Sequence, residues 1–161
     1  MSSEQESDFR AYSVIADFDG VMHSSPNVLN HLDATHSPQC LHLDIGGEGR
    51  HFNAVNLNPS THTTCLSGPQ LPIPNHLQGR GESIPCSDCS VFLITIENTE
   101  ITEDMTIEIK RVLDAHGIIR LIHPTGYAAE AHSYVATIVN GKVFRTEEPG
   151  QTTTWITLAS G

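Results

Sequence analysis

The residues best suited to chemistry lie in one short stretch, Asp44-Ile45-Gly46-Gly47-Glu48-Gly49. It follows an apolar run that begins at residue 41, and a second apolar run begins at residue 54, so the pattern predicts a strand, a tight turn and another strand. In an open α/β sheet, a turn at the carboxyl end of a strand lies where ligands bind, and glycine lets the backbone approach a ligand closely. The spacing is neither the dinucleotide fingerprint nor a P-loop. The alternative is that the glycines only form a tight exit from the strand.

A second candidate site is Asp17-Phe18-Asp19-Gly20-Val21, which follows another apolar run. It resembles the nucleophile motif of haloacid-dehalogenase-type phosphatases, in which the first Asp attacks phosphorus and the second acts as general acid. That chemistry also needs a Mg²⁺ site with further carboxylates and a lysine. The two lysines, Lys110 and Lys142, do not follow strands in a suitable loop. The sequence therefore disfavours the phosphatase.

The four cysteines include the pair Cys86-Ser87-Asp88-Cys89, which has the Cys-x-x-Cys spacing of zinc knuckles and redox pairs. A structural zinc site needs a second ligand pair, and none is evident. A thioredoxin-like pair opens a helix, whereas this one lies in a polar loop. We expect ordinary loop cysteines and no metal site.

Composition limits the partners. The 161 residues carry 19 acidic and 8 basic side chains, for a formal charge of -11, and ten histidines. Such an acidic surface repels phosphate backbones, so nucleic acid is an unexpected partner. No apolar run approaches the roughly 20 residues that span a bilayer, and the polar, acidic N-terminus is unlike a secretory signal. We expect a cytoplasmic protein without membrane contact.

These candidates depend on a regular series of elements. We expect a disordered tail (1–10) and a single domain (11–161), made of an N-terminal segment (11–38) and a core (39–161). The segment includes a short helix over 25–36. In the core, apolar runs predict strands over 41–45, 54–57, 91–96 and 118–122, and helical spacing predicts helices over 101–113, with Thr102 as its cap, and 127–139. Residues 58–80 read as a long loop, and 143–146 with 152–158 as an antiparallel edge hairpin.

The order of these elements is similar to that of class I S-adenosylmethionine-dependent methyltransferases. The run from Leu43 to Gly49 resembles the family's first motif, Asp-x-Gly-x-Gly-x-Gly. The segment Gly81-Glu82-Ser83-Ile84-Pro85 resembles the one that precedes the fourth strand. Glu108-Ile109-Lys110-Arg111-Val112-Leu113, followed by Gly117, is similar to Glu-x-x-Arg-Val-Leu-x-x-Gly-Gly. The resemblance covers residue 41 to the C-terminus and implies a reduced, mostly parallel Rossmann-like α/β sheet with an antiparallel C-terminal hairpin.

The resemblance also implies S-adenosylmethionine as cofactor and methyl transfer as activity. The glycine turn would bring backbone amides to the amino-acid end of the cofactor. Asn58 would then bind the ribose hydroxyls, and Glu82 or Ser83 the adenine edge. Glu97 and Asn98 would face the methyl group and the substrate. A base is needed only if the nucleophile must lose a proton. The implied cofactor-binding residues are Asp44, Gly46, Gly47, Glu48, Gly49, Asn58, Glu82 and Asn98, and the implied catalytic bases are Glu97 and His123.

The sequence departs from the family at several of these positions. Glu48 stands where the middle glycine is usual, and Asn58 replaces a ribose-binding acid, which weakens that bond because a neutral amide replaces a charged acceptor. Phe92 takes the usual Asp position in the fourth strand. The helix between the first two strands has shrunk to a turn. These changes affect cofactor binding more than the fold.

Two readings therefore remain open beside the phosphatase. In the first, the chain transfers a methyl group to a small molecule or a peptide or protein substrate. In the second, it keeps the methyltransferase fold without that activity and serves as a binding module or catalyses another reaction. The variant motifs also resemble short methyltransferase-like domains of bacterial polymorphic toxins. The substrate is not readable from the sequence, and neither is the oligomeric state, although an edge hairpin can pair with another copy.

Overall fold

The computed structural model describes residues 41–65 and 67–159. The predicted tail (1–10), the segment 11–38 with its helix, Asp17 and Asp19 lie outside the described residues. Within the described part, no helix is long and apolar enough to cross a membrane.

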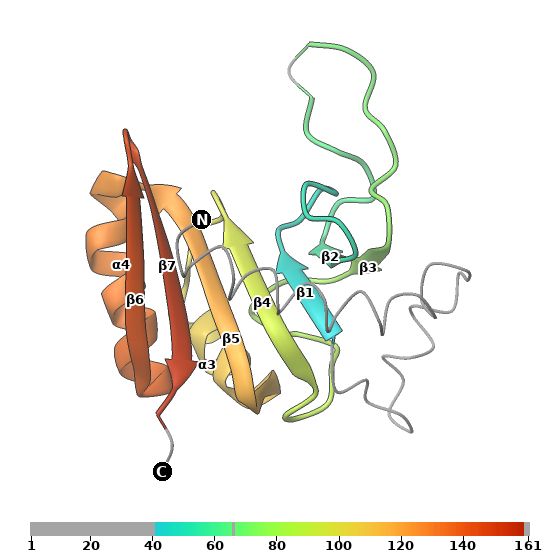
Figure 1. Ribbon diagram of the computed structural model, residues 1–161. Coiled ribbons are helices and arrows are strands. Elements are labelled where there is room, and N and C mark those ends of the chain that lie inside the picture. Colours follow the sequence, from blue (N-terminus) through green and yellow to red (C-terminus); the bar gives the residue numbers. More distant parts are fainter. Residues whose placement is uncertain (1–40, 66, 160–161) are drawn as a thin grey trace.

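Seven strands form one sheet in the order β3-β2-β1-β4-β5-β7-β6 (Figure 1). Neighbours from β3 to β5 pair in parallel, whereas β7 is antiparallel to both β5 and β6. This confirms the prediction of a mostly parallel sheet that ends in an antiparallel hairpin. The strands are β1 (Leu41–Ile45), β2 (Val55–Asn58), β3 (His76–Gln78), β4 (Val91–Glu97), β5 (Leu113–Pro124), β6 (Gly141–Glu148) and β7 (Gln151–Leu158).

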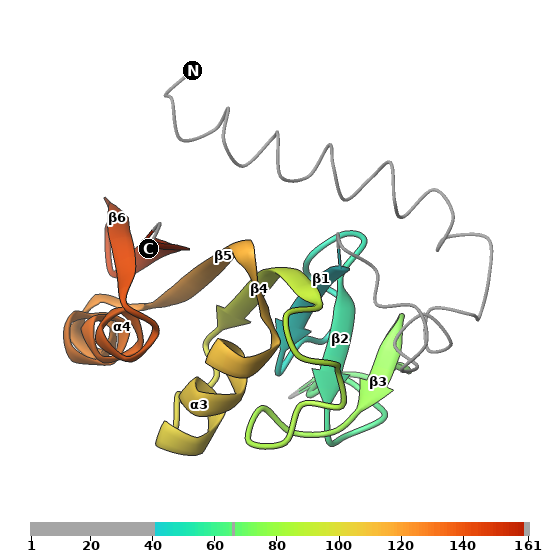
Figure 2. The same cartoon turned by 90° about the horizontal axis from the view of Figure 1, so that it is seen from below.

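Two helices, α3 (Glu103–Val112) and α4 (Thr125–Val139), lie on the same face of the sheet (Figure 2). The hydroxyl of Thr102 accepts a hydrogen bond from the Met105 amide and so caps α3, as predicted. Asn140, in the left-handed conformation with φ 54°, ends α4. Both helices connect parallel strands, which need a crossover of this kind.

The core lies between this helical layer and the sheet. Because side chains alternate along a strand, Leu43, Ile94 and Ile119 point to the helices and pack with Ile109 of α3 and Val135 of α4, all fully buried. The opposite face of the same strands carries buried polar groups instead, His42, Thr95 and Arg120. The sheet is therefore apolar on one side and polar on the other, near the carboxyl ends of the strands.

The structure corrects two of the predicted elements. Residues 76–78, predicted as loop, form β3, because they pair with β2 although the run is too short to show a pattern. The strand predicted over 118–122 is longer, since β5 begins at Leu113 directly after α3, where Leu113 pairs with Val91 of β4. The long loop is therefore interrupted, and Gly117 lies inside a strand rather than between two elements.

The Glu-x-x-Arg pair of α3 holds the loop between β3 and β4. Arg111 donates hydrogen bonds to the carbonyls of Ile84 and Cys86, at 2.7 and 2.8 Å, and to the Glu108 carboxylate. Glu108 also accepts the Ile84 amide at 2.8 Å. These bonds lower the pKa of Glu108. The motif thus has a structural use, which is to position the chain that enters β4.

Candidate functional site

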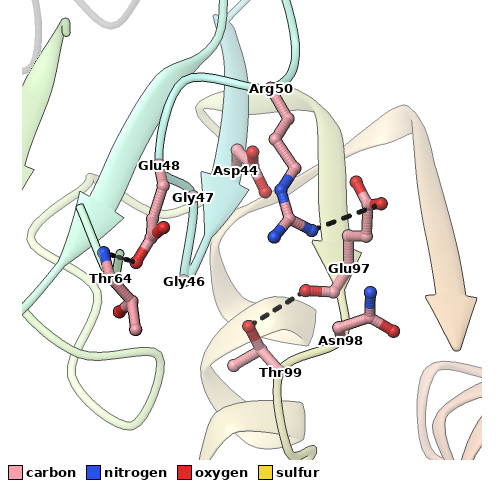
Figure 3. A pocket seen from close by; sticks show the side chains of 9 residues that line it. All are labelled: Asp44, Gly46, Gly47, Glu48, Arg50, Thr64, Glu97, Asn98 and Thr99. Carbon is pink, nitrogen blue, oxygen red and sulfur yellow. Dashed lines mark hydrogen bonds and ion pairs between the residues drawn. The ribbon is translucent and has the colours of Figure 1, made fainter. Parts of the chain in front are cut away.

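A cavity of about 370 Å³ opens at the carboxyl ends of β1 and β4 (Figure 3). It is the place where ligands bind in open α/β sheets. Three of its carboxylates come from β1, the glycine turn and β4, and one arginine extends over it. The lining residues are Asp44, Gly46, Gly47, Glu48, Arg50, Thr64, Glu97, Asn98 and Thr99.

The glycine turn lies against protein on one side and the cavity on the other. Gly46 has φ +76°, and a Cβ there would overlap the Thr99 hydroxyl. A Cβ on Gly47 would overlap the Asn56 side chain and come within 2.6 Å of the Asp44 carboxylate. Glycine is therefore required at both positions, and the backbone of both residues borders the cavity.

Buried amides of β2 hold the turn in place. Asn56 accepts the Gly49 amide at 3.1 Å and donates to the Pro74 carbonyl at 2.7 Å, so it joins the turn to the loop before β3. Asn58 donates to the Gly47 carbonyl at 3.2 Å and accepts the Ser60 amide at 2.9 Å. Both ends of the Asn58 amide thus bond to the protein backbone, and Asn58 is not among the lining residues.

Asp44 is a buried carboxyl that lines the cavity, with 2% of its surface exposed. Burial and, to a smaller extent, the nearby charge of Glu97 raise its pKa to about 7, although Arg120 and Arg50 oppose the shift. Its charge is therefore sensitive to any cation that enters the cavity, because a positive ligand favours the ionised form.

Glu97, at the end of β4, is held from two sides. Arg50 extends across the cavity, and its guanidinium lies 3.5 Å from the Glu97 carboxylate (Figure 3). The His51 Nε2 lies 2.8 Å from the other carboxylate oxygen. The carboxylate therefore points into the cavity with both oxygens engaged.

His51 connects Glu97 to the buried arginine of β5. Arg120 donates to His51 Nδ1 at 3.1 Å. Since a guanidinium only donates, Nδ1 must accept, so the proton of the neutral ring lies on Nε2 and is donated to Glu97. Burial, followed by the charge of Arg120, lowers the pKa of His51. The result is a neutral histidine that orients a carboxylate.

Glu48 ties a distant loop to the glycine turn. Its carboxylate accepts the Thr64 amide at 2.9 Å, and Thr64 lines the cavity (Figure 3). Thr64 belongs to a loop that projects beyond β2 and β3 (Figure 1). At the base of this loop, the Ile73 amide donates a hydrogen bond to the Thr61 carbonyl. The carboxylate that replaces the middle glycine thus fastens one wall of the cavity.

Glu48→Ala is expected to detach the loop around Thr64 from the glycine turn. The Thr64 amide loses a charged acceptor, so its hydrogen exchange should rise about threefold to tenfold, while the core amides of β1 and β4 are unchanged. Glu48→Gln, which keeps an acceptor oxygen, serves as the control and should lie between the two. Equal exchange at Thr64 in all three proteins would contradict the tether.

His123 lies in a second cavity, of about 420 Å³, at the ends of β4 and β5. Its Nε2 donates to the Thr99 carbonyl at 2.8 Å, and its Nδ1 lies 2.9 Å from His132 Nε2. His132 Nδ1 in turn lies 2.7 Å from the Thr154 hydroxyl. Because the carbonyl can only accept, the bonds run consistently from Thr154 to Thr99 with both rings neutral.

Burial keeps both rings of this pair neutral. It lowers the pKa of His123, and it lowers that of His132 to about 4, with the charge of His123 adding to the effect. The second cavity shares Asn98 and Thr99 with the first and is also lined by Glu100, Pro124 and Tyr127. The two cavities are therefore neighbours across one short turn.

The structure brings together part of the predicted site. Six of the predicted residues line the first cavity: Asp44, Gly46, Gly47, Glu48, Glu97 and Asn98. His123 lines the second cavity. Gly49 lies next to the lining, where a Cβ would contact Pro74. Asn58 and Glu82 lie outside the lining, and Glu82 accepts the Thr102 hydroxyl at 3.0 Å. Their roles in holding the cofactor stay predictions.

Several residues at the site were not predicted: Arg50, His51, Asn56, Thr64 and Arg120. Arg50 and His51 follow the glycine turn directly, so their position in the sequence could have indicated that they lie near the cavity. Thr64 and Arg120 carried no such signal, because they reach the site from a loop and from β5.

No family model and no curated protein matches the sequence. Solved structures do match. A candidate S-adenosyl-L-methionine-dependent methyltransferase from Methanococcus maripaludis aligns with 98% of the chain and 92% of its own length, at a TM-score of 0.53 and 12% identity. A SAM-dependent methyltransferase from Aquifex aeolicus aligns with 91% of the chain and 98% of its own length, at 0.51 and 16%.

A third match, to a candidate type 11 methyltransferase from Sulfolobus solfataricus, covers 53% of the chain and 59% of that protein at a TM-score of 0.42 and 18% identity. At such identities the likeness concerns the fold alone. None of the matches bears on the toxin domains, so that resemblance stays a prediction. The described residues have the Rossmann-like fold of class I S-adenosylmethionine-dependent methyltransferases.

Proposed function

We propose that this chain binds S-adenosylmethionine in the first cavity and transfers its methyl group to a small molecule or to a peptide or protein. One observation carries the proposal. A glycine turn that tolerates no Cβ borders a cavity with three carboxylates and one arginine, at the carboxyl ends of β1 and β4. The fold shared with methyltransferases supports it.

The charges of the cavity fit this cofactor. S-adenosylmethionine carries a sulfonium and an ammonium group beside one carboxylate, so a negative lining favours it over an anionic nucleotide. Asp44 and Glu48 line the cavity and would attract the two cations, and the backbone of Gly46 and Gly47 would border the amino-acid end. Bound cofactor supplies an electrophilic methyl group.

The chain's contribution to transfer is then orientation and proton removal. Asn98 and Thr99 separate the two cavities, so an acceptor in the second cavity would lie next to the first. Glu97 is the candidate base whose carboxylate lines the first cavity, and it would take a proton at the oxygen that Arg50 faces. His123 would first have to give up a bond at one of its ring nitrogens.

The alternative is a methyltransferase fold without methyl transfer, used as a binding module or for another reaction. Two observations favour it. Arg50 forms an ion pair with Glu97 across the cavity, and neither Asn58 nor Glu82 is among the residues that line the cavity. The adenosine half of the cofactor would then lack its expected partners. The phosphatase hypothesis depends on Asp17, outside the described residues, and stays a prediction.

Calorimetric titration with S-adenosylmethionine and with S-adenosylhomocysteine separates these functions. We expect both to bind, and Gly47→Ala to weaken binding at least tenfold, since the new Cβ displaces Asp44 and Asn56. Gly126→Ala is the matched control, because nothing lies within 4 Å of a Cβ there. A well-folded protein that binds neither compound would exclude the methyltransferase and leave the binding module.

A further inference from the structure

The outer strand β6 (Gly141–Glu148) presents an unusually open edge. It is the last strand in the sheet order, and within the described residues no other strand pairs with its outer side. Val143 and Phe144 are exposed by 44% and 47%, although most apolar side chains of the other strands are buried. An eight-residue edge of this kind is a template for pairing with another strand.

The charges along β6 change sign from one end to the other. Lys142 and Arg145 lie in its first five residues, and Glu147 and Glu148 end it. An antiparallel partner with the same sequence places the acidic end of one copy beside the basic end of the other. The strand is therefore complementary to itself, which a strand with a single sign of charge is not.

Symmetry restricts how two such strands can pair. A two-fold axis normal to the sheet leaves each side chain on the same face of the sheet in both copies. Two residues directly opposite each other on neighbouring antiparallel strands also have their side chains on the same face. A residue must therefore lie opposite its own copy. With Arg145 at the axis, two like charges would be directly opposed, which is destabilising. With Phe144 at the axis, two aromatic rings meet.

The Phe144 register also places the charges favourably. Lys142 then lies opposite Thr146 of the other copy and diagonal to its Glu148, within reach of a long side chain. Phe144 pairs with Trp155 of β7 inside each copy. A row of aromatic residues would thus run across the junction on the polar face of the sheet.

We propose that two copies of this chain associate through antiparallel pairing of their β6 strands, with Phe144 opposite Phe144, to form a continuous fourteen-stranded sheet twice the seven strands of one copy. The occupant of the edge is a second copy rather than a foreign peptide because the charge pattern is self-complementary. The two cavities of each copy lie at the carboxyl ends of β1, β4 and β5, away from this edge. The proposal does not depend on methyl transfer.

Sedimentation of the full chain over a hundredfold range of concentration tests this. We expect a concentration-dependent dimer, and Phe144→Lys should shift the equilibrium to monomer by more than tenfold, since it places two cations face to face. Lys142→Glu and Glu148→Lys should each weaken the dimer, and the double variant that exchanges the two charges should restore it.

Lys110→Glu on the exposed side of α3 is the control for Lys142→Glu, because it makes the same change of net charge away from β6. Circular dichroism checks that each variant is folded. A full chain that stays monomeric at every concentration would overturn the proposal, and so would a dimer that is unaffected by Phe144→Lys or is not restored by the charge exchange.

Discussion

Asp44→Asn is expected to stabilise the protein above pH 7 while it weakens cofactor binding. The folded-state pKa of Asp44 is raised from 3.8 to about 7, mainly by burial and then by Glu97. Between these values the folded state binds more protons than the unfolded state, so the free energy of unfolding falls as pH rises from about 4 to 7. The accumulated cost is up to about 4 kcal/mol at pH 8.

The variant removes that cost because asparagine is uncharged and similar in shape. We expect its free energy of unfolding to exceed that of the wild type by roughly 2–4 kcal/mol at pH 8, with little difference near pH 4. Urea denaturation at several pH values measures this. Exposed Asp104→Asn is the control and should change stability by less than about 1 kcal/mol, since it loses only a favourable charge in the first turn of α3.

Binding should move in the opposite direction. If Asp44 holds a cationic group of the cofactor, its loss should weaken binding of S-adenosylmethionine more than tenfold at pH 8, and less at pH 6, where the wild-type carboxyl is largely protonated. If the variant is more stable but binds S-adenosylmethionine normally, Asp44 does not contact the cofactor and is only a buried carboxyl that destabilises the protein. A variant with no gain in stability would contradict the raised pKa.

His132→Gln should make the protein more resistant to acid. The pKa of His132 is lowered from 6.5 to about 4 by burial, and His42, His51 and His123 are shifted in the same direction. The unfolded state therefore binds more protons than the folded state below about pH 6.5, and stability is lost as pH falls towards 4. Asp44 acts oppositely in this range, but its contribution is the same in the variant and in the wild type and cancels in their difference.

Glutamine can donate to His123 and accept from Thr154, as His132 does, but it does not titrate. At pH 5, the lowered pKa of His132 reduces the free energy of unfolding of the wild type by about 2 kcal/mol. Between pH 8 and pH 5, the stability of the variant relative to the wild type should therefore rise by about 2 kcal/mol. Thermal or urea unfolding at the two pH values measures this. The control is His116→Gln, since His116 is exposed, and it should show no such change. A parallel pH profile for His132→Gln and the wild type would contradict the neutral histidine pair.

Most of the described fold could be predicted from the sequence because the signals are local. The apolar run of β1, the cap and spacing of α3, and the apolar runs of β4 and β5 each specify an element within a few residues. The order of these elements, with α3 and α4 as the helical crossovers after β4 and β5, then restricts the sheet to few arrangements. β3 was not predicted, because three residues are too few to show a strand pattern and the strand is defined only by its pairing with β2.

The site was predictable only in the residues adjacent to strand ends. Asp44, Gly46, Gly47 and Glu97 line the cavity because parallel strands present their carboxyl ends at one edge. The prediction that Asn58 faces a ligand rested on its place at the end of β2. In the structure, both ends of its amide bond to backbone groups of neighbouring turns, a detail that sequence position does not carry.

The sequence by itself determined the strand, glycine turn and strand, the two crossover helices and the acidic character of the protein. It determined them because each depends on neighbouring residues or on composition alone. Tertiary structure alone decided which side chains meet: Arg50 and His51 with Glu97, Glu48 with Thr64, and the buried pair of His123 with His132. These contacts join side chains from different strands, helices and loops, so they follow from strand register and loop path, which no local pattern specifies.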